Sequence, residues 1–258
     1  MYIISLVVTS FRIQNLIQII RNIEQQTLIP EKVLVYYSVE PWHLDDGIKK
    51  IHPIETPLNI EFRCVPNMGS SRKYLFTLKE YYLKNTKILF IDDDRLWRPD
   101  VFEILYKKIT DENLSLVTTS GWSSFSMIRN EMQQPILRTH TVHSHQITKN
   151  KEILIASSGW ATMINSNAIN PRIFDENLIK EYRVTESDEI YLSTMINASK
   201  YVVPISGNCY YNLNSKVNLW FNEKTTDAKL KQLQLFSKFK NIRWFDKNES
   251  FHPNSLLP

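Results

Sequence analysis

Ile88-Leu89-Phe90-Ile91-Asp92-Asp93-Asp94, residues 88–94, places three consecutive carboxylates directly after an apolar run. A short run of this kind is typical of a buried strand, so the aspartates stand where that strand would leave its sheet. Adjacent carboxylates repel one another, and the cluster therefore needs a cation or several hydrogen-bond donors. Two acids separated by one residue can share Mg²⁺ or Mn²⁺, which bind hard oxygen ligands. The alternative interpretation is a solvated turn after the strand.

The segments before this strand alternate between strand and helix patterns. Apolar runs with the length of core strands cover residues 3–8, 32–37 and 60–65. Between them, apolar residues recur at helical spacing over 13–23 and 74–82. This alternation predicts an α/β fold with a mostly parallel sheet covered on both faces. Ligands of such sheets bind beyond the carboxyl ends of the strands, where residues 92–94 would project.

The second half of the chain has weaker patterns. A helix is expected over 101–108 and a strand over 114–118, whereas residues 121–151 are irregular and rich in polar side chains. We expect that segment to be a surface loop or a substrate lid. Its His143 and His145 form an HxH pair without a third nearby ligand, which is weak evidence for a metal site.

The composition excludes several classes of protein. With 258 residues, 43% of them hydrophobic, the chain can bury a substantial core and is not expected to be disordered. Cys64 and Cys209 belong to no CxxC or Cys/His pattern, so a reducing compartment is expected, with neither a disulfide framework nor a zinc site. The longest apolar runs are too short for a transmembrane helix, and residues 3–8 are interpreted as a strand and not as a signal peptide. The net charge of +4 favours anionic ligands in general.

Two basic residues open the helix predicted before the aspartates. Arg72 and Lys73 directly follow Gly69-Ser70-Ser71, so they fall in the first helical turn, where the helix dipole is positive. Cations are electrostatically misplaced there unless an anion such as a phosphate lies against the helix end. The alternative is a pair of solvated surface cations, which would cost up to about 1 kcal/mol.

A second acidic cluster, Glu186-Ser187-Asp188-Glu189, precedes a helical pattern over 190–196. Carboxylates in a first helical turn are favourable in any protein, which is the plain interpretation. A carboxylate held near an apolar or anionic site can also act as a general base. Gly159 and Trp160 stand beside a predicted strand, as in a wall that meets a ligand ring.

The C-terminal region has a basic amphipathic pattern over 225–245, in which lysines alternate with Leu and Phe residues. One interpretation is a helix packed on the domain with a solvated basic face. The other is a helix that lies on an anionic membrane surface.

As a set, these segments resemble the GT-A glycosyltransferases, in particular the family-2-like bacterial enzymes. The resemblance covers roughly residues 1–210, and the segments that carry it are, in order, residues 7–12, 26–32, 69–73, 92–94 with Pro99, 159–160 and 188–193.

This resemblance implies a Rossmann-like, mostly parallel central sheet flanked by helices, with a C-terminal helical segment. The catalytic domain would span 1–210, with a nucleotide-sugar half over about 1–100 and an acceptor half over about 101–210. Residues 211–258 would form a helical extension packed on it.

The resemblance also implies roles for individual residues. A nucleotide-diphosphate-sugar donor would be bound by the residues at matching positions, which are Thr9, Ser10, Arg12, Glu40, Gly69, Arg72, Lys73, Asp92 and Asp93. Asp94, together with Asp92, would bind Mn²⁺ or Mg²⁺. The metal and the basic groups would stabilise charge on the departing nucleotide diphosphate.

On the acceptor side, Gly159 and Trp160 would contact the acceptor, and Asp188 or Glu189 would take its proton during an inverting transfer. The family's commoner order is Glu-Asp, whereas this chain has Asp-Glu. Counting back from Leu192 places Glu189 at the usual base position, so the choice between the two neighbours stays open. His252 is a further candidate for contact with the metal or the diphosphate, as C-terminal histidines make in some GT-A relatives.

The implied function is a metal-dependent inverting glycosyltransferase that uses a nucleotide-diphosphate sugar, with a UDP-sugar favoured. The acceptor would be a hydroxyl of a glycan or a lipid-linked glycan in bacterial surface polysaccharide synthesis. The enzyme would act in the cytoplasm, with possible peripheral contact at the inner membrane. Alternatives are a nucleotidyltransferase or another metal-dependent enzyme that handles nucleotides, and a non-catalytic glycan-binding module. Nucleic acid is not an expected partner, because it would require a continuous basic and aromatic surface, and carboxylates in the main cleft repel phosphates unless a metal intervenes.

Overall fold

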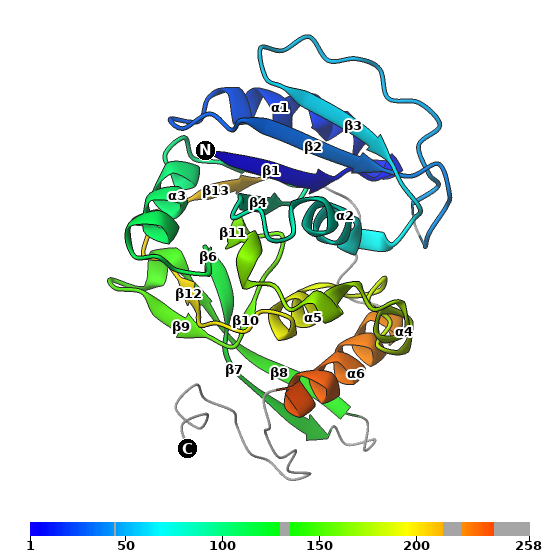
Figure 1. Ribbon diagram of the computed structural model, residues 1–258, viewed down its shortest axis with the longest axis vertical. Helices are drawn as coiled ribbons and strands as arrows, with labels where there is room; N and C mark the ends of the chain where they lie inside the picture. The colour runs from blue at the N-terminus through cyan, green and yellow to red at the C-terminus, as the bar shows by residue number, and fades with distance from the viewer. Residues whose placement is uncertain (44, 130–134, 214–222, 240–258) are drawn as a thin grey trace.

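The computed structural model describes residues 1–43, 45–129, 135–213 and 223–239. Its centre is an eight-stranded sheet with the order β3-β2-β1-β4-β11-β6-β12-β9 (Figure 1). The strands of this sheet are β1 (Tyr2–Val7), β2 (Lys32–Tyr37), β3 (Ile60–Cys64), β4 (Lys87–Ile91), β6 (Leu116–Thr118), β9 (Lys151–Ile153), β11 (Thr162–Asn165) and β12 (Lys200–Val202).

The half of the sheet built from β3, β2, β1 and β4 is parallel throughout, as the strand and helix alternation predicts. Beyond it, β11 runs antiparallel between β4 and β6. The chain leaves β1 toward β2 on one side and returns to β4 on the other, so the strand order reverses between β1 and β4. Ligands of open α/β sheets bind at such a reversal. The predicted α/β class with a mostly parallel sheet is confirmed.

Helices cover both faces of the sheet (Figure 1). The apolar side chains of α1 (Leu16–Glu24) and α3 (Val101–Asp111) pack with one set of strand residues. Those of α2 (Arg72–Tyr81), α4 (Glu176–Glu181) and α5 (Glu189–Thr194) pack with the alternate set. Because neighbouring residues of a strand face opposite sides, β1 and β4 contribute to both cores, which explains their unbroken apolar runs.

Short 3-10 helices precede or connect these elements. They are η1 (Ser10–Asn15), η2 (Gly69–Ser71), η3 (Ser144–Gln146), η4 (Ser166–Ala168) and η5 (Pro171–Phe174). The helix predicted over 13–23 therefore begins as η1 and becomes α-helical at Leu16.

Residues 121–151 differ from the expected surface loop. Most of this segment belongs to β7 (Ser120–Arg129) and β8 (Pro135–His143), which pair antiparallel and form a second sheet with β10 (Ile155–Ala156). A register shift between Trp122 and Ser124 interrupts the alternation of apolar and polar residues in β7. A bulge of this kind hides the period-two signal of a strand from the sequence. A third sheet pairs β5 (Arg95–Trp97) with β13 (Tyr210–Asn212).

The C-terminal helix α6 (Glu223–Phe239) packs beside α5 and the β7–β8 hairpin (Figure 1). Its Leu233 and Phe236 join Trp122 and Phe125 in a small apolar core. The apolar face of α6 is thus buried against the protein, as the packed-helix interpretation expects, whereas Lys229 on the same helix is buried and not solvated. Predicted helical residues 240–245 and His252 lie outside the described residues. In the part of the chain that the structure describes, no helix is long and apolar enough to cross a membrane.

Candidate active site

The site lies where β1 and β4 end side by side. Leu6 of β1 is in register with Ile91 of β4, so the loop after β1 and the aspartates after β4 emerge at the same edge of the sheet. Because ligands of open α/β sheets bind at such a reversal of strand order, a ligand is expected between the two loops. The alternative of a solvated aspartate turn is wrong for Asp93, which is 4% exposed, and Asp94 is also largely buried.

Asp93 ties the two loops together. Its Oδ2 accepts hydrogen bonds from the backbone N–H and the Oγ1 of Thr9, both at 3.2 Å, and Arg12 Nη1 lies 2.9 Å from its Oδ1. Asn15 Nδ2 donates to the Asp93 carbonyl at 3.1 Å. Burial raises the pKa of Asp93 against the attraction of Arg12. In the structure Asp93 and Thr9 therefore bind each other, as a buried carboxylate needs hydrogen-bond donors, and their contact with a nucleotide sugar stays a prediction.

Lys73 connects the first aspartate with the second acidic cluster. Its ammonium is 2.7 Å from Asp92 Oδ1 and 3.1 Å from Asp188 Oδ2, and its side chain is only 2% exposed. Ser158 Oγ donates to the same Asp188 oxygen at 2.8 Å. Burial works against the charge of Lys73, but attraction by Asp188 and Asp92 outweighs burial and raises the pKa of Lys73. The site is therefore built around a buried, charged ammonium.

Asp94 is held from two sides by guanidinium groups. Arg12 Nη1 lies 3.2 Å from its Oδ2, and Arg95 Nη1 lies 3.1 Å from its Oδ1. The Oδ1 atom is buried and has no hydrogen-bond partner among the described residues, because the approach of Arg95 lacks hydrogen-bond geometry. Burial and the neighbouring Asp92 carboxylate raise the pKa of Asp94 despite both guanidinium groups.

Arg95 is a site residue that the sequence analysis missed. Its guanidinium carbon lies 4.2 Å from the ring centroid of Trp160 and 5.7 Å from that of Tyr210. The Trp160 ring also contacts Tyr210 and His143, with centroids 4.9 and 5.1 Å away. Trp160 therefore belongs to an aromatic wall beside the aspartates. The only signal was the position of a cation directly after a carboxylate cluster.

Two glycines are required by close contacts. A Cβ on Gly159 would lie 1.6 Å from Asp92 Oδ2, so only glycine lets the Asp92 carboxylate occupy its place. Gly69 has φ +59°, and a Cβ there would lie 2.1 Å from the Thr185 carbonyl oxygen. Gly69 thus allows the start of α2 to approach the segment that leads into α5. The structure brings Gly159, Trp160 and the aspartates together, as the resemblance implies.

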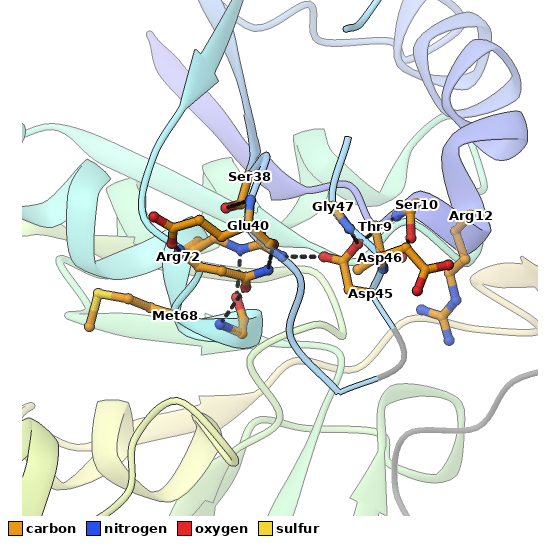
Figure 2. Close-up of polar contacts among 12 residues, drawn as sticks. Thr9, Ser10, Arg12, Ser38, Glu40, Asp45, Asp46, Gly47, Met68 and Arg72 are labelled. Carbon is orange, nitrogen blue, oxygen red and sulfur yellow. Dashed lines mark hydrogen bonds and ion pairs between the residues drawn. The ribbon is translucent and has the colours of Figure 1, made fainter. Parts of the chain in front are cut away.

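Arg72 faces a different carboxylate from Lys73 (Figure 2). Its Nη2 lies 3.1 Å from Asp45 Oδ2, and its Nε donates to the Gly69 carbonyl at 2.9 Å. Asp45 Oδ1 also accepts from the backbone N–H groups of Ser10 and Gly47. The solvated-cation interpretation is wrong for Arg72 and Lys73, which are 1% and 2% exposed. Asp45 was missed, although Asp45-Asp46-Gly47 has the composition of a turn.

Ser10 and Glu40 lie at the outer part of this region (Figure 2). Ser10 Oγ accepts from the backbone N–H of Asp46 at 2.9 Å. Glu40 Oε2 accepts from the Asn67 N–H at 3.0 Å, and Asn67 Nδ2 donates to the Glu40 carbonyl at 2.7 Å. The loops after β1, β2 and β3 are thus connected by polar contacts around Asp45 and Glu40.

The neighbours Asp188 and Glu189 face different partners. Within the described chain, the Asp188 side chain caps no N–H group of α5 and instead binds Lys73 and Ser158. Glu189 is 5% exposed, and Lys229 of α6 lies 3.5 Å from its Oε1. Burial raises the pKa of Glu189 to about 7, against the opposing attraction of Lys229. A carboxylate with a pKa near 7 suits a general base at neutral pH.

Asp92 and Asp94 fit a divalent metal whose coordination a bound ligand would complete. Asp92 and Asp94 supply hard oxygen donors, and the buried Asp94 Oδ1 lacks a hydrogen-bond partner among the described residues. In the described ranges, this site included, no group of three or more His, Cys, Asp or Glu side chains is placed to hold a metal, so a bound ligand would have to supply the remaining oxygens. The rings of His143 and His145 stack on one another, and no third ligand joins this pair among the described residues. Cys64 and Cys209 are both free thiols, the first exposed and the second buried.

Comparisons with known proteins agree with the fold. No family model and no curated protein matches the sequence. Among solved structures, S. aureus TarS 1–349 in complex with UDP-GlcNAc is similar over 95% of this chain and 68% of that chain, with a TM-score of 0.52 and 12% identity. The complex with UDP has a TM-score of 0.54 at 12% identity, again over 95% and 68% of the two chains. The structure of TarS 1–349 alone has a TM-score of 0.51 at 13% identity, over 95% and 67%. The chain therefore has the GT-A fold of TarS.

Proposed function

We propose that this chain is an inverting glycosyltransferase that moves a sugar from a UDP-sugar to an acceptor hydroxyl. The observation that carries the proposal is the shared ammonium of Lys73, which joins Asp92 to Asp188 at the strand-order reversal. This arrangement places the aspartates that would face the diphosphate next to the acidic pair that contains the candidate base. A fold shared with a protein that was solved with UDP-GlcNAc and with UDP supports the choice of donor.

The donor's diphosphate would lie against the aspartate edge. Lys73, Arg12 and Arg95 supply three positive charges there, and all three are largely buried, so water screens them weakly. Mn²⁺ or Mg²⁺ held by Asp92 and Asp94 would neutralise charge on the diphosphate, since such ions combine one or two carboxylates with phosphate oxygens. The loops joined through Ser10, Asp45 and Glu40 would hold the nucleoside.

On the acceptor side, Glu189 would act as the general base. Its pKa of about 7 keeps about half of the side chains ionised at neutral pH, which suits proton transfer from a hydroxyl. Asp188 is engaged by Lys73 and Ser158 and would hold the ammonium in place. Attack by the acceptor oxygen forms the new glycosidic bond and breaks the bond to the diphosphate, with inversion at the sugar carbon.

Trp160 and Tyr210 would form a wall for the acceptor, because aromatic faces pack against the apolar faces of sugar rings. We propose a glycan or a lipid-linked glycan as the acceptor, in bacterial surface polysaccharide synthesis. A cytoplasmic location with peripheral contact at the inner membrane rests on the resemblance alone, because the apolar face of α6 is buried.

Release of UDP tests this function. The protein is incubated with UDP-GlcNAc, UDP-glucose or UDP-galactose and Mn²⁺, and free UDP is measured with and without candidate glycan acceptors. We expect at least one donor to release UDP, and Asp94→Asn to abolish that release. If none of the donors releases UDP, or if Asp94→Asn releases it like the wild type, the proposal is wrong.

A further inference from the structure

Every oxygen of the two candidate metal-binding carboxylates faces a cation of the protein. Asp92 Oδ1 is 2.7 Å from Lys73 Nζ, and Asp94 Oδ2 is 3.2 Å from Arg12 Nη1. The remaining two oxygens share one partner, because Arg95 Nη1 is 3.1 Å from Asp94 Oδ1 and 3.7 Å from Asp92 Oδ2. The guanidinium of Arg95 thus bridges the two carboxylates, as a shared divalent metal would.

The surroundings hold Arg95 in this bridging position. Its side chain is 13% exposed and is stacked against Trp160, with 4.2 Å between the guanidinium carbon and the ring centroid. The Arg95 backbone is in register with Asn212 in the β5–β13 pair. Because Gly159 has no Cβ, Asp92 Oδ2 has room to approach the guanidinium of Arg95.

The bridging position satisfies the charge of Arg95 but not its hydrogen bonds. Its Nε and Nη1 atoms are buried and have no hydrogen-bond acceptor among the described residues. A buried donor without an acceptor costs about 1–3 kcal/mol. A guanidinium stays charged at any accessible pH, so only another anion offers it a better partner. Phosphate oxygens accept two parallel N–H bonds from a guanidinium and would satisfy these donors.

We propose that Arg95 is a built-in counter-ion that bridges Asp92 and Asp94 in the free protein and turns to the diphosphate when the donor binds. This inference rests on the proposed function and deepens it. In the free protein Arg95 competes with a divalent metal for the two carboxylates. Donor binding removes Arg95 from them and leaves their oxygens available. Metal and nucleotide diphosphate then strengthen each other's binding by the same factor, because the coupling is reciprocal.

Direct measurement of Mn²⁺ binding tests this role without an activity assay. Free Mn²⁺ is followed by electron paramagnetic resonance in titrations of the wild type and of Arg95→Met, each with and without UDP. Methionine keeps an unbranched apolar stem beside Trp160 and removes the charge. Arg98→Met is the matched control, since Arg98 pairs with Asp100 on the same strand end, away from the aspartate cluster.

We expect the wild type and Arg98→Met to bind Mn²⁺ weakly alone and at least tenfold more tightly with UDP. Arg95→Met should bind Mn²⁺ alone at least tenfold more tightly than the wild type, and UDP should strengthen its Mn²⁺ binding by a smaller factor than in the wild type. If Arg95→Met does not fold, Arg95→Lys replaces it and should show a smaller gain in the same direction.

Two outcomes would overturn the proposal in different ways. Unchanged Mn²⁺ affinity in the Arg95 variant, with metal-dependent UDP binding intact in the wild type, would refute the role of Arg95 and leave the proposed function standing. Absence of metal-dependent UDP binding in the wild type would overturn both.

Discussion

The ammonium of Lys73 lies 2.7 Å from a carboxylate oxygen of Asp92, although the two residues come from the start of α2 and the end of β4. The same ammonium is 3.1 Å from Asp188. One buried cation therefore holds the donor-side aspartate and the acidic pair of α5 together. Loss of this cation should disturb both halves of the site at once.

Replacement of Lys73 should destabilise the fold as well as the site. Lys73→Met leaves Asp92 and Asp188 without their shared counter-ion, and breaking a buried ion pair typically costs about 3–5 kcal/mol. Urea denaturation measures this loss, with Lys79→Met as the control, because Lys79 is an exposed residue of the same helix. Equal midpoints for the two variants would show that the Lys73 contacts do not contribute to stability.

The pH dependence of sugar transfer should report Glu189. A base works in its ionised form, so kcat/KM should fall as the pH is lowered through about 7, where burial places the pKa of Glu189. Glu189→Gln should lose about 10²–10⁴-fold in kcat and also lose this pH dependence. Asp188→Asn should weaken donor binding but keep the pH dependence of kcat/KM. A Glu189→Gln enzyme with the wild-type pH profile would point to Asp188 as the base.

The pKa of Glu189 should also make the stability of the protein depend on pH, but stability should fall with rising pH whereas activity rises. The pKa of Glu189 is raised from 4.5 to about 7 in the folded state, so the folded protein binds more protons than the unfolded chain between these values. Unfolding free energy should therefore decrease as the pH rises from about 5 to 7. Denaturation at several pH values should show this decrease in the wild type and a shallower one in Glu189→Gln.

Replacement of Gln232 should loosen the contact between α6 and the segment that carries Asp188 and Glu189. Its Nε2 donates to the carbonyls of Ser187 and Tyr182 at 2.7 and 3.1 Å, and its Oε1 accepts from the Tyr191 N–H at 3.1 Å. Gln232→Ala leaves these buried groups unpaired, so we expect a loss of about 3 kcal/mol and reduced kcat. Gln234→Ala, on the exposed side of α6, should match the wild type in both assays.

Gly159 should tolerate no side chain. In Gly159→Ala the new Cβ would lie 1.6 Å from Asp92 Oδ2, so the carboxylate must move and UDP binding should fall at least tenfold. Gly207→Ala is a control for the loss of a glycine, since Gly207 has φ +70° but a Cβ there would meet, among the described residues, only Arg98 within 4 Å. Its thermal midpoint should fall while UDP binding stays unchanged. Equal UDP affinity in the two variants would contradict the placement of Asp92.

The central features could be predicted because they depend on local patterns. The strands β1, β2 and β4 are buried on both faces, and such strands can be predicted because they have nearly continuous apolar runs. The grouping of Lys73, Asp92 and Asp188 followed from the resemblance and not from any spacing. The β7–β8 hairpin was missed because a bulge breaks its alternation. Asp45 was missed because its partners Ser10 and Arg72 are distant in sequence. Arg95 was missed, although it directly follows the aspartates, because the rings that hold it come from other segments.

The most direct measurement is calorimetric titration of UDP into the protein with Mn²⁺ and with EDTA, for the wild type and Asp94→Asn. We predict binding by the wild type that Mn²⁺ strengthens at least tenfold, and loss of that strengthening in Asp94→Asn with the fold intact by circular dichroism. UDP binding that is equal with Mn²⁺ and EDTA and unchanged in Asp94→Asn would contradict a metal–diphosphate site at these aspartates.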